Sequence, residues 1–415
     1  MESGFNNIAG LVPGAPGANF GIRVYSTVLE VKTMRIRFED IAFNSTAKKK
    51  PVDADKNTYL GLEHLDSGNL TVTRFGTEVA PIGEKLIMKK GDVLFGKRRA
   101  YQKKVAIAPF DGIFSAHGMV LRPKENTVDR EFFPLFISSD YFLDSAIKIS
   151  VGSLSPTINW SALKELEFEL PSIAEQRKLA DLLWAANAVR EAYKKLLAAT
   201  DELVKSQFVE MFGDPVTDSM EWGVRPLNDS LVSVKYGTGT PPPYSEAGFA
   251  FIRATNIKQG RIVDSGMKFI SEEDSQKIEK CRLNGGELII VRSGVNTGDT
   301  CVVTQQYAGH YAGYDIIVET DPQKLNAVFL NELLNTSYMQ FVVKPLTARS
   351  AQPHINAEQV KSLPIIQAPL PLQTRFADFV RQADKSKFAL KKSLAEPEAL
   401  YKSLMERAFS GKLFG

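Results

Sequence analysis

Positions 97 to 104 bring together side chains that are well suited to bind an anionic polymer. They combine five cations with a tyrosine and a glutamine, and they follow the apolar run that begins after Asp92. Arginine and glutamine can read guanine and adenine edges in the major groove of DNA, while lysines hold phosphates. A solvated loop would have the same composition, so the segment alone leaves both interpretations open. The candidate DNA contacts in it are Lys97, Arg98, Arg99, Tyr101, Gln102, Lys103 and Lys104.

A comparable loop follows a second glycine–acid pair, Gly286-Glu287, and the apolar run after it. This loop offers Arg292, Ser293 and Asn296, with fewer cations, so we expect the two loops to read different sequences. A third basic segment, Lys48-Lys49-Lys50, could contact phosphate, but a lysine run is more often only a solvated face. Weaker candidates for DNA contact are Lys235, Tyr236, Arg253, Asn256, Lys258, Arg349, Gln352 and His354.

The segment Pro241-Pro242-Pro243-Tyr244 superficially resembles the Asn/Asp-Pro-Pro-Tyr motif of amino-methylating enzymes. Here Pro241 stands where the motif needs an amide or a carboxylate to accept a hydrogen bond from the target amino group. The preceding Gly237–Thr240 is followed by prolines rather than by a helix, so it does not form a cofactor-binding turn. We therefore expect a rigid loop that can still approach DNA.

Other catalytic or metal-binding arrangements are not recognisable. Asp92 has one lysine nearby but no second carboxylate, as a metal-dependent nuclease would need, and we interpret it as a turn residue before a strand. The four histidines are scattered, and Cys281 and Cys301 lack a CxxC spacing. We expect no metal site, no cofactor and no disulfide, in keeping with the cytoplasm.

The chain of 415 residues is long enough for two to four domains, with an ordinary globular composition. Its net charge of +3 neither demands nor excludes nucleic acid. No apolar run reaches membrane-spanning length, and residues 1–33 do not have the pattern of a signal peptide. Because residues 1–33 are rich in Gly, Pro and Ala, we expect a flexible extension there, with the first domain starting near Met34.

The sequence contains an internal repeat. Ser155-Pro156-Thr157-Ile158-Asn159 returns as Gln352-Pro353-His354-Ile355-Asn356, an offset of 197 positions from Asn159 to Asn356 that then continues without a gap. Upstream, the two copies match only at short apolar runs bounded by Gly, Asn and Asp, which are typical of strands. The repeat predicts a pseudo-twofold α+β protein with two β-rich globular domains, suited to a target made of two halves.

The repeat also predicts two long helices. The segment from about Ala174 to Phe212 lacks Gly and Pro and has apolar residues at heptad spacing, which favours an antiparallel coiled coil with its repeat from about Gln373 to Phe409. Pro397 is expected to bend or split the second helix near Glu396. The residues predicted to pair the helices are Leu182, Val189, Leu196, Leu203, Phe376, Val380, Leu390, Leu394 and Leu404.

Two variable globular domains alternating with two long, mutually similar helices resemble the specificity (S) subunits of Type I restriction–modification systems. The resemblance covers nearly all of the chain from about Met34. Residues 169–180, which include Pro171 and Glu175-Gln176, look like that family's Leu-Pro-Pro-x-x-Glu-Gln-x-x-Ile-Ala entry into a central conserved helix. Residues 211–215 look like its exit. In the second copy the residue before Gln373 is Leu372, so the Glu-Gln pair is absent there.

The resemblance implies a non-catalytic subunit that binds double-stranded DNA with a bipartite target sequence. Residues 34–170 and 214–368 would be target recognition domains, and this layout favours DNA contact by the basic loop. Residues 171–213 and 369–415 would be paired helices that act as a ruler. Two adenine methyltransferase (M) subunits and restriction (R) subunits would bind the chain.

Three alternatives remain open at the level of the sequence. One is the specificity chain of a related two-subunit restriction–modification enzyme. The others belong to different classes, a DNA adenine methyltransferase and a scaffold protein that does not bind DNA.

Overall fold

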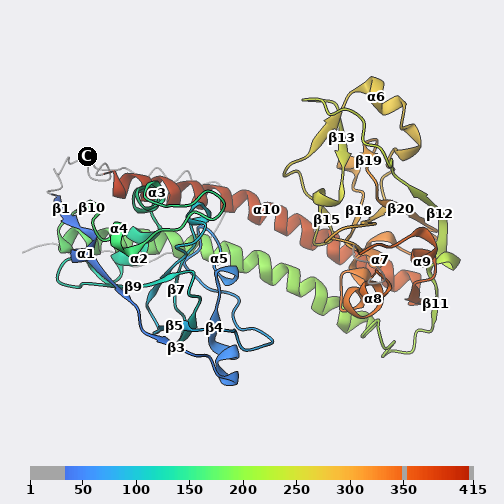
Figure 1. The fold of residues 1–415 in the computed structure, drawn as a ribbon. Helices are drawn as coiled ribbons and strands as arrows, with labels where there is room; N and C mark the ends of the chain where they lie inside the picture. The colour runs from blue at the N-terminus through green and yellow to red at the C-terminus, as the bar shows by residue number, and fades with distance from the viewer. Residues whose placement is uncertain (1–32, 348–352, 411–415) are drawn as a thin grey trace, which may run out of the picture. The chain divides into compact units, whose positions relative to one another are not determined.

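The computed structural model describes residues 33–347 and 353–410, and the extension expected at residues 1–33 lies outside this range except for Thr33 (Figure 1). The chain divides into two compact units. Unit 1 comprises residues up to 189 together with those from 397, and unit 2 comprises residues 190–396. Each long helix therefore contributes one segment to each unit.

Unit 1 is built on two four-stranded sheets. In these two sheets all strand pairs are antiparallel except β4 with β8, which are parallel. The first sheet has the order β2 (Ala42–Ser45), β9 (Met119–Pro123), β6 (Val93–Phe95) and β7 (Val105–Ile107). The second has the order β3 (Lys48–Lys49), β5 (Lys85–Met88), β8 (Gly112–Phe114) and β4 (Tyr59–Leu60). The remaining elements are the pair β1 (Met34–Arg37) and β10 (Glu167–Leu170) and the helices α1 (Phe38–Ile41), α2 (Phe132–Ser138), α3 (Asp140–Lys148) and α4 (Trp160–Leu163).

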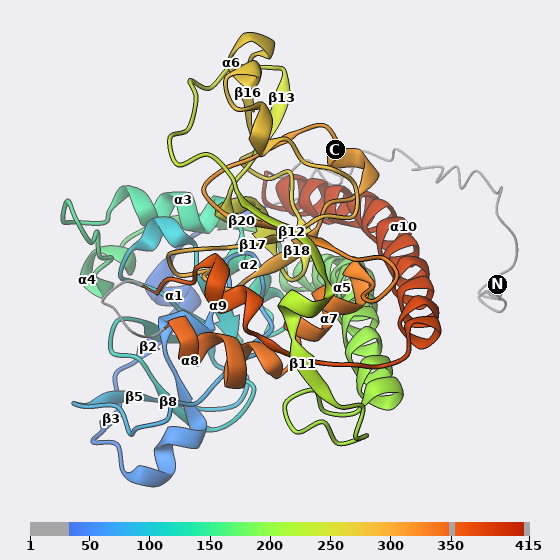
Figure 2. The ribbon, with the colours of Figure 1, turned by 90° about the vertical axis from the view of Figure 1, so that its right-hand side faces the viewer.

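Unit 2 repeats this plan, and its main sheet uses the equivalent strands in the same order (Figure 2). That sheet consists of β12 (Leu231–Tyr236), β20 (Ile316–Thr320), β17 (Leu288–Ile290) and β18 (Thr300–Val302). A smaller sheet contains β16 (Lys268–Ile270), β13 (Phe249–Ile252) and β19 (Tyr311–Ala312), with β13 and β19 parallel. Two further pairs are β14 (Ile257–Lys258) with β15 (Arg261–Ile262) and β11 (Val224–Pro226) with β21 (Pro364–Ile366). The short helices are α6 (Glu272–Gln276), α7 (Ala327–Leu334), α8 (Lys344–Thr347) and α9 (Ala357–Lys361). The predicted α+β repeat is thus confirmed.

The two long helices are α5 (Ile173–Phe212) and α10 (Leu370–Phe409), each of 40 residues. At the start of α5, Ser172 and Glu175 form reciprocal hydrogen bonds, in which each backbone N–H donates to the other residue's side chain. Gly213 follows the last residue with φ of 74°, the left-handed conformation that commonly ends a helix. The split expected at Pro397 is not found, because α10 is one helix through this residue. A proline removes a single helical hydrogen bond, and the flanking Leu394 and Tyr401 are both buried.

In unit 2, the end of α5 packs against the start of α10. The rings of Phe208 and Phe212 lie 5.5 and 5.4 Å from that of Phe376, and Asp201 forms an ion pair with Lys387. Residues near the C-terminal end of α5 therefore contact residues near the N-terminal end of α10, so the two helices pair in antiparallel orientation. In unit 1, Leu404 and Phe409 of α10 pack on the core that contains Leu179, Ala180 and Leu183 of α5.

The pairing row predicted on α5 is wrong by one position. Leu182, Val189, Leu196 and Leu203 are 43%, 50%, 52% and 52% exposed. Their successors in the chain face the protein instead, with Leu183 fully buried and Val204 at 5% exposure. Adjacent residues point about 100° apart around a helix, so a shift of one residue changes the face. Sequence reasoning chose the most uniformly apolar row, whereas the packed row also carries the half-buried Arg190. On α10 the predicted residues Phe376, Val380 and Leu394 are buried, and Leu390 and Leu404 are partly buried.

A buried glutamine fixes the start of each long helix in the same way. Gln176 accepts a hydrogen bond from the N–H of Asp129 at 2.8 Å and donates to the carbonyl oxygen of Pro171 at 2.9 Å. Gln373 accepts from the N–H of Asn326 at 2.9 Å and donates to the carbonyl oxygen of Ala368 at 2.8 Å. Both side chains thus tie the helix start to the segment before the preceding domain's helix, α2 or α7. Every residue in one set lies 197 positions from its counterpart in the other.

Candidate nucleic-acid interface

The basic loop of unit 1 connects β6 to β7 and is held against the segment that precedes α4. The N–H of Arg99 donates to the carbonyl oxygen of Pro156 at 2.8 Å, and the N–H of Ile158 donates to that of Lys97 at 3.0 Å. Arg99 and Lys103 have φ of 54° and 48°, a left-handed conformation that folds the loop tightly. The structure therefore brings the basic loop and the loop at residues 152–157 together at one edge of the unit.

Unit 2 contains the same arrangement between the loop after β17 and the segment before α9. The N–H of Ile355 donates to the carbonyl oxygen of Arg292 at 2.9 Å, and Ser293 pairs with His354 as Arg98 pairs with Thr157. Two loops that sequence analysis treated as separate candidates are adjacent in each unit. Arg349 and Gln352, from the second of these loops, lie outside the described residues.

The edge of unit 1 is strongly cationic. Arg98 is exposed, and its Nη1 lies 3.3 Å from Nε2 of His117. The pKa of Lys97 is lowered by burial and by the nearby charge of Lys48, and the pKa of His117 is lowered by burial and then by Arg98, Lys97 and Lys85. Burial is the largest single cause of each pKa shift, and like charges close together add to it. Sequence reasoning missed Lys85 and His117, because neither lies in a basic run and only the fold brings them to the loop.

Two of the predicted cations of this loop are engaged in structural contacts. Lys103 forms ion pairs with Asp140 and Asp144 of α3 at 2.6 and 2.7 Å. Lys104 donates to the carbonyl oxygen of Leu62 at 2.6 Å. Both contacts hold the loop in place, and the assignment of the two lysines as DNA contacts stays a prediction. Arg99 and Tyr101 are exposed, and Gln102 is half-buried.

At the corresponding edge of unit 2, Arg292 lies between two aromatic rings. Its Cζ is 4.6 Å from the ring centre of Tyr236 and 4.4 Å from that of Tyr314. Tyr314 was not singled out from the sequence, since a lone tyrosine before a strand carries no signal of its own. Lys235, in contrast, forms an ion pair with the buried Glu287 at 2.8 Å, and its assignment as a DNA contact stays a prediction.

The weaker candidates for DNA contact in unit 2 differ in how far they are exposed to solvent. Asn256 is fully buried and donates to the carbonyl oxygens of Val263 and Ser265, so it shapes a turn and does not face a ligand. Arg253 is half-buried, with its Cζ 5.8 Å from the ring of the exposed Tyr244. Lys258 is exposed. Asn296 lies 3.5 Å from the carbonyl oxygen of Ala254, within the loop that carries Arg292.

Three residues that were considered for catalysis or metal binding, Asp92, Cys281 and Cys301, are buried in the protein. Asp92 is buried, accepts from the N–H of Lys89, and binds Arg122 through two hydrogen bonds of 2.6 and 2.8 Å. It is therefore the turn residue expected from the sequence. Cys281 and Cys301 are both buried and free. Among the described residues, no helix is long and apolar enough to span a membrane.

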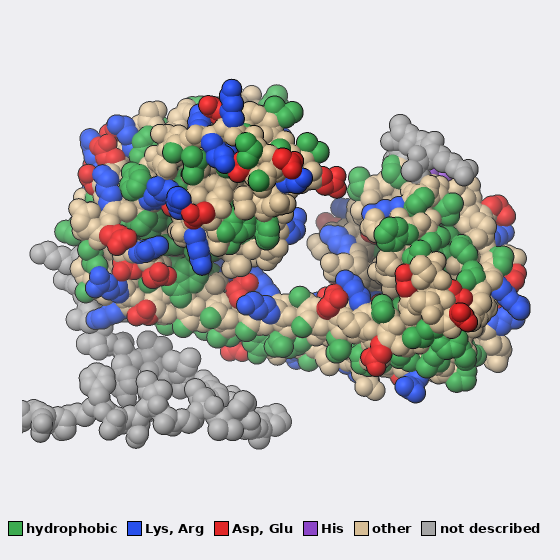
Figure 3. All heavy atoms as spheres, turned by 90° about the horizontal axis from the view of Figure 1, so that it is seen from below, with side chains coloured by type: hydrophobic (Ala, Val, Ile, Leu, Met, Phe, Trp, Pro, Cys, Tyr) green, Lys and Arg blue, Asp and Glu red, His purple; other side chains and the backbone are tan. Residues whose placement is uncertain are grey.

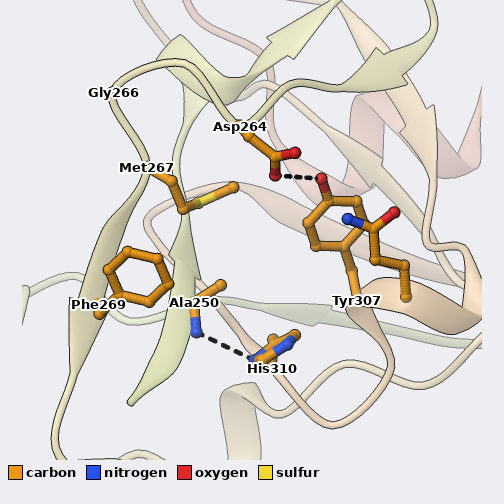
Figure 4. Close-up of a pocket in the computed structure, with 8 residues that line it drawn as sticks. Ala250, Asp264, Gly266, Met267, Phe269, Tyr307 and His310 are labelled. Carbon is orange, nitrogen blue, oxygen red and sulfur yellow. Dashed lines mark hydrogen bonds between the residues drawn. The ribbon is translucent and has the colours of Figure 1, made fainter. Parts of the chain in front are cut away.

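A pocket of about 360 Å³ lies beside β13 in unit 2 (Figure 4). Tyr307 donates to Asp264 at 2.6 Å, and the N–H of Ala250 donates to Nδ1 of His310 at 3.0 Å. Burial lowers the pKa of His310. The tyrosine hydroxyl and one histidine nitrogen are thus engaged by the protein itself. Met267 and Phe269 line the rest of the pocket.

Charge on the visible surface follows no continuous track. Figure 3 shows lysine and arginine side chains spread over both units and interspersed with aspartate and glutamate. On this face, local groups of cations rather than a continuous track are the candidates for contact with a polyanion.

The sequence is similar to known specificity subunits. It is 26% identical to the Type I restriction enzyme EcoDI specificity subunit of Escherichia coli over 48% of this chain and 44% of that one, so this match spans less than half of the relative. It is 21% identical to the EcoKI specificity subunit of E. coli over 74% of this chain and 70% of that one. It is also 21% identical to the MjaVIII specificity subunit of Methanocaldococcus jannaschii over 91% and 92%.

The fold is similar to that of a solved specificity subunit. The crystal structure of the Type I restriction–modification system S subunit from M. genitalium superimposes with a TM-score of 0.52 and 14% identity, covering 91% of this chain and 96% of that one. The family described as the Type I restriction modification DNA specificity domain matches residues 44–194 and 221–400, one match for each copy of the repeat. These two matches include most of the chain, which therefore belongs to the Type I restriction–modification DNA specificity family.

Proposed function

We propose that this chain is the DNA sequence-specificity subunit of a Type I restriction–modification complex, acting in the cytoplasm on double-stranded DNA. Residues 34–170 and 214–368 would be its two target recognition domains, each reading one half of a bipartite site. The observation that carries the proposal is the repeated edge, formed by the loop after β6 or β17 and the loop before α4 or α9. The same backbone contacts present different side chains in the two units, as two unlike half-sites require.

The exposed row on α5 supports a second part of the proposal, the recruitment of partner proteins. Leu182, Val189, Leu196 and Leu203 recur at heptad spacing on one face of the helix and are half-exposed. An apolar heptad row is suited to pack against helices of another protein. We infer that two methyltransferase subunits dock on the long helices, and that restriction subunits join them. Methyl transfer would then belong to the partners, and the purified chain alone would transfer no methyl groups.

The direct test is to remove positive charge from the edge of unit 1 and to measure binding of duplex DNA that carries its half-site. Arg98 lacks an acidic partner within the described residues, and Lys97 lies beside it. Replacing both with Met in the assembled complex should weaken binding to duplexes that carry the unit 1 half-site, while the specificity for the other half-site is unchanged. The matched control is Lys90→Met, which removes an exposed cation of the same unit that lies outside both loops of the edge. Binding that is unaltered by the double replacement would refute the assignment of this edge.

The scaffold alternative is separated by a salt titration. Because phosphate contacts release counterions, the affinity for duplex DNA should fall steeply as salt rises. A protein that does not bind DNA would show neither the affinity nor the salt dependence. The neighbouring genes would distinguish a Type I system from the related two-subunit enzyme.

A further inference from the structure

The guanidinium group of Arg292 is held by stacking instead of by an acidic partner. Its Cζ lies 4.6 Å from the ring centre of Tyr236 and 4.4 Å from that of Tyr314. Both distances are within the range at which a cation is attracted to an aromatic face. The Nε atom is buried and has no hydrogen-bond partner among the residues that the structure describes.

Backbone contacts fix two members of this stack, Arg292 and Tyr236. The backbone N–H of Arg292 donates to the carboxylate of Asp315 at 3.0 Å, and its carbonyl oxygen accepts from the N–H of Ile355 at 2.9 Å. The hydroxyl of Tyr236 accepts from the N–H of Ala357 at 2.9 Å. Backbone contacts therefore hold both the arginine and one of its two rings in place before any ligand binds.

The stack remains open to a ligand. Tyr236 and Tyr314 are 38% and 44% exposed, and Arg292 is half-buried. Asp315, the acid nearest in sequence to the stack, is 3% exposed and accepts the backbone N–H of Arg292. In residues 33–347 and 353–410, no carboxylate forms an ion pair with the Arg292 guanidinium. Its charge is thus presented together with a fixed plane of donors.

The stack is specific to unit 2. By the repeat, Arg292 corresponds to Lys97, because the carbonyl oxygen of Arg292 accepts from the N–H of Ile355 as that of Lys97 accepts from the N–H of Ile158. Tyr314 precedes β20 as His117 precedes β9, at the same offset of 197 positions. Unit 1 therefore has a flexible lysine beside an imidazole where unit 2 has a planar guanidinium between two rings. The shared scaffold does not require the stack, which leaves recognition as its role.

Resting on the proposed function, we propose that Arg292 reads a guanine in the half-site bound by unit 2, with Tyr236 and Tyr314 as positioning residues. Guanine presents two acceptors, O6 and N7, at its major-groove edge, and two parallel N–H groups of an arginine match them. Stacking fixes the plane of these donors, which a base edge requires. An arginine can also bind a phosphate through two parallel N–H groups, but only a base contact makes binding depend on sequence, which the experiment below measures.

The test uses the full chain with its methyltransferase subunits and a pool of duplexes that is randomised in both half-sites. The wild type should prefer a G·C pair at one position of the unit 2 half-site. Arg292→Met keeps much of the apolar stem but removes the donors, and should reduce that preference by roughly 5- to 150-fold. Preferences at all other positions should remain. Tyr314→Leu, which leaves Arg292 in place but removes one ring, should relax the same position to a smaller extent.

The matched comparison is Lys97→Met, the equivalent change in unit 1, which should weaken binding through the unit 1 half-site but leave the G·C preference in the unit 2 half-site intact. A uniform loss of affinity for all sequences with a shallower salt dependence would show that Arg292 contacts phosphate, and would overturn the proposal. An unchanged preference in both unit 2 variants would overturn it as well. If the wild type itself shows no bipartite preference, the proposed function fails instead.

Discussion

At the residue scale, the two buried glutamines are the most closely conserved structural feature of the repeat. Gln176 and Gln373 are 0% and 2% exposed, and each satisfies backbone groups that would otherwise be buried without partners. The sequence showed that these residues correspond, but not what they bond. Their contacts explain why Gln373 is retained although the acidic residue before it is lost.

Replacing Gln373 with Leu should lower the free energy of unfolding by about 2–4 kcal/mol, because the N–H of Asn326 and the carbonyl oxygen of Ala368 would lose their buried partner. The matched control is Gln382→Leu, at an exposed position of the same helix. Urea unfolding followed by circular dichroism measures both. Equal effects of the two changes would show that the buried hydrogen bonds contribute little.

Asp315 gives a pH-dependent prediction. Burial raises its pKa to about 6, although the N–H and the charge of Arg292 oppose the shift. An unfolded aspartate has a pKa of about 3.9. Between these values the folded chain binds a proton that the unfolded chain does not, so this group's contribution to stability falls as the pH rises through about 6, by up to about 3 kcal/mol.

Asp315→Asn should therefore raise stability relative to the wild type more at pH 7.5 than at pH 4.5. The measurement is the difference in unfolding free energy between the two proteins at each pH, in which the other titrating groups cancel. A difference that is the same at both values, or larger at pH 4.5, would contradict the predicted direction.

At the scale of elements, α5 has two apolar rows with different roles. One row, with Leu183 and Val204, is buried, and the neighbouring row, with Leu182 and Leu203, is exposed. Heptad periodicity favoured the exposed row, because the buried row is interrupted by Arg190. The exposed row is the one that we propose for docking of another chain.

Leu183→Ala should cost about 2–5 kcal/mol of stability, as is usual when a buried leucine leaves a cavity. Leu182→Ala, one residue earlier and 43% exposed, should cost under about 1 kcal/mol. Thermal unfolding of the isolated chain compares the stabilities of the two variants.

The exposed row gives a prediction for assembly. Leu182→Asp should weaken binding of the methyltransferase subunits, as measured by co-purification. Normal assembly of that variant would argue against docking on this row.

At the scale of the whole molecule, the proposed function gives the long helices the role of a ruler. Removing one heptad from both α5 and α10 shortens each by about 10 Å and preserves the packed row. We expect the spacer between the two half-sites to shrink by about three base pairs, given a rise of about 3.4 Å per pair. Mapping methylated sites for the wild type and the shortened protein measures this. An unchanged spacer would refute the ruler.

The sequence by itself determined the repeat, the α+β class, the two long helices and the family, because each depends on patterns of residues along the chain. It also found the loops at Lys97 and Arg292, since runs of cations and glycine–acid pairs are local signals. Only the tertiary structure decided which side chains are available. Lys103, Lys104 and Lys235 are paired with groups far away in the chain, Asn256 is buried in a turn, and His117 and Tyr314 join the sites through strand order. The buried face of α5 was settled in the same way, because packing against α10 selects one of two adjacent rows.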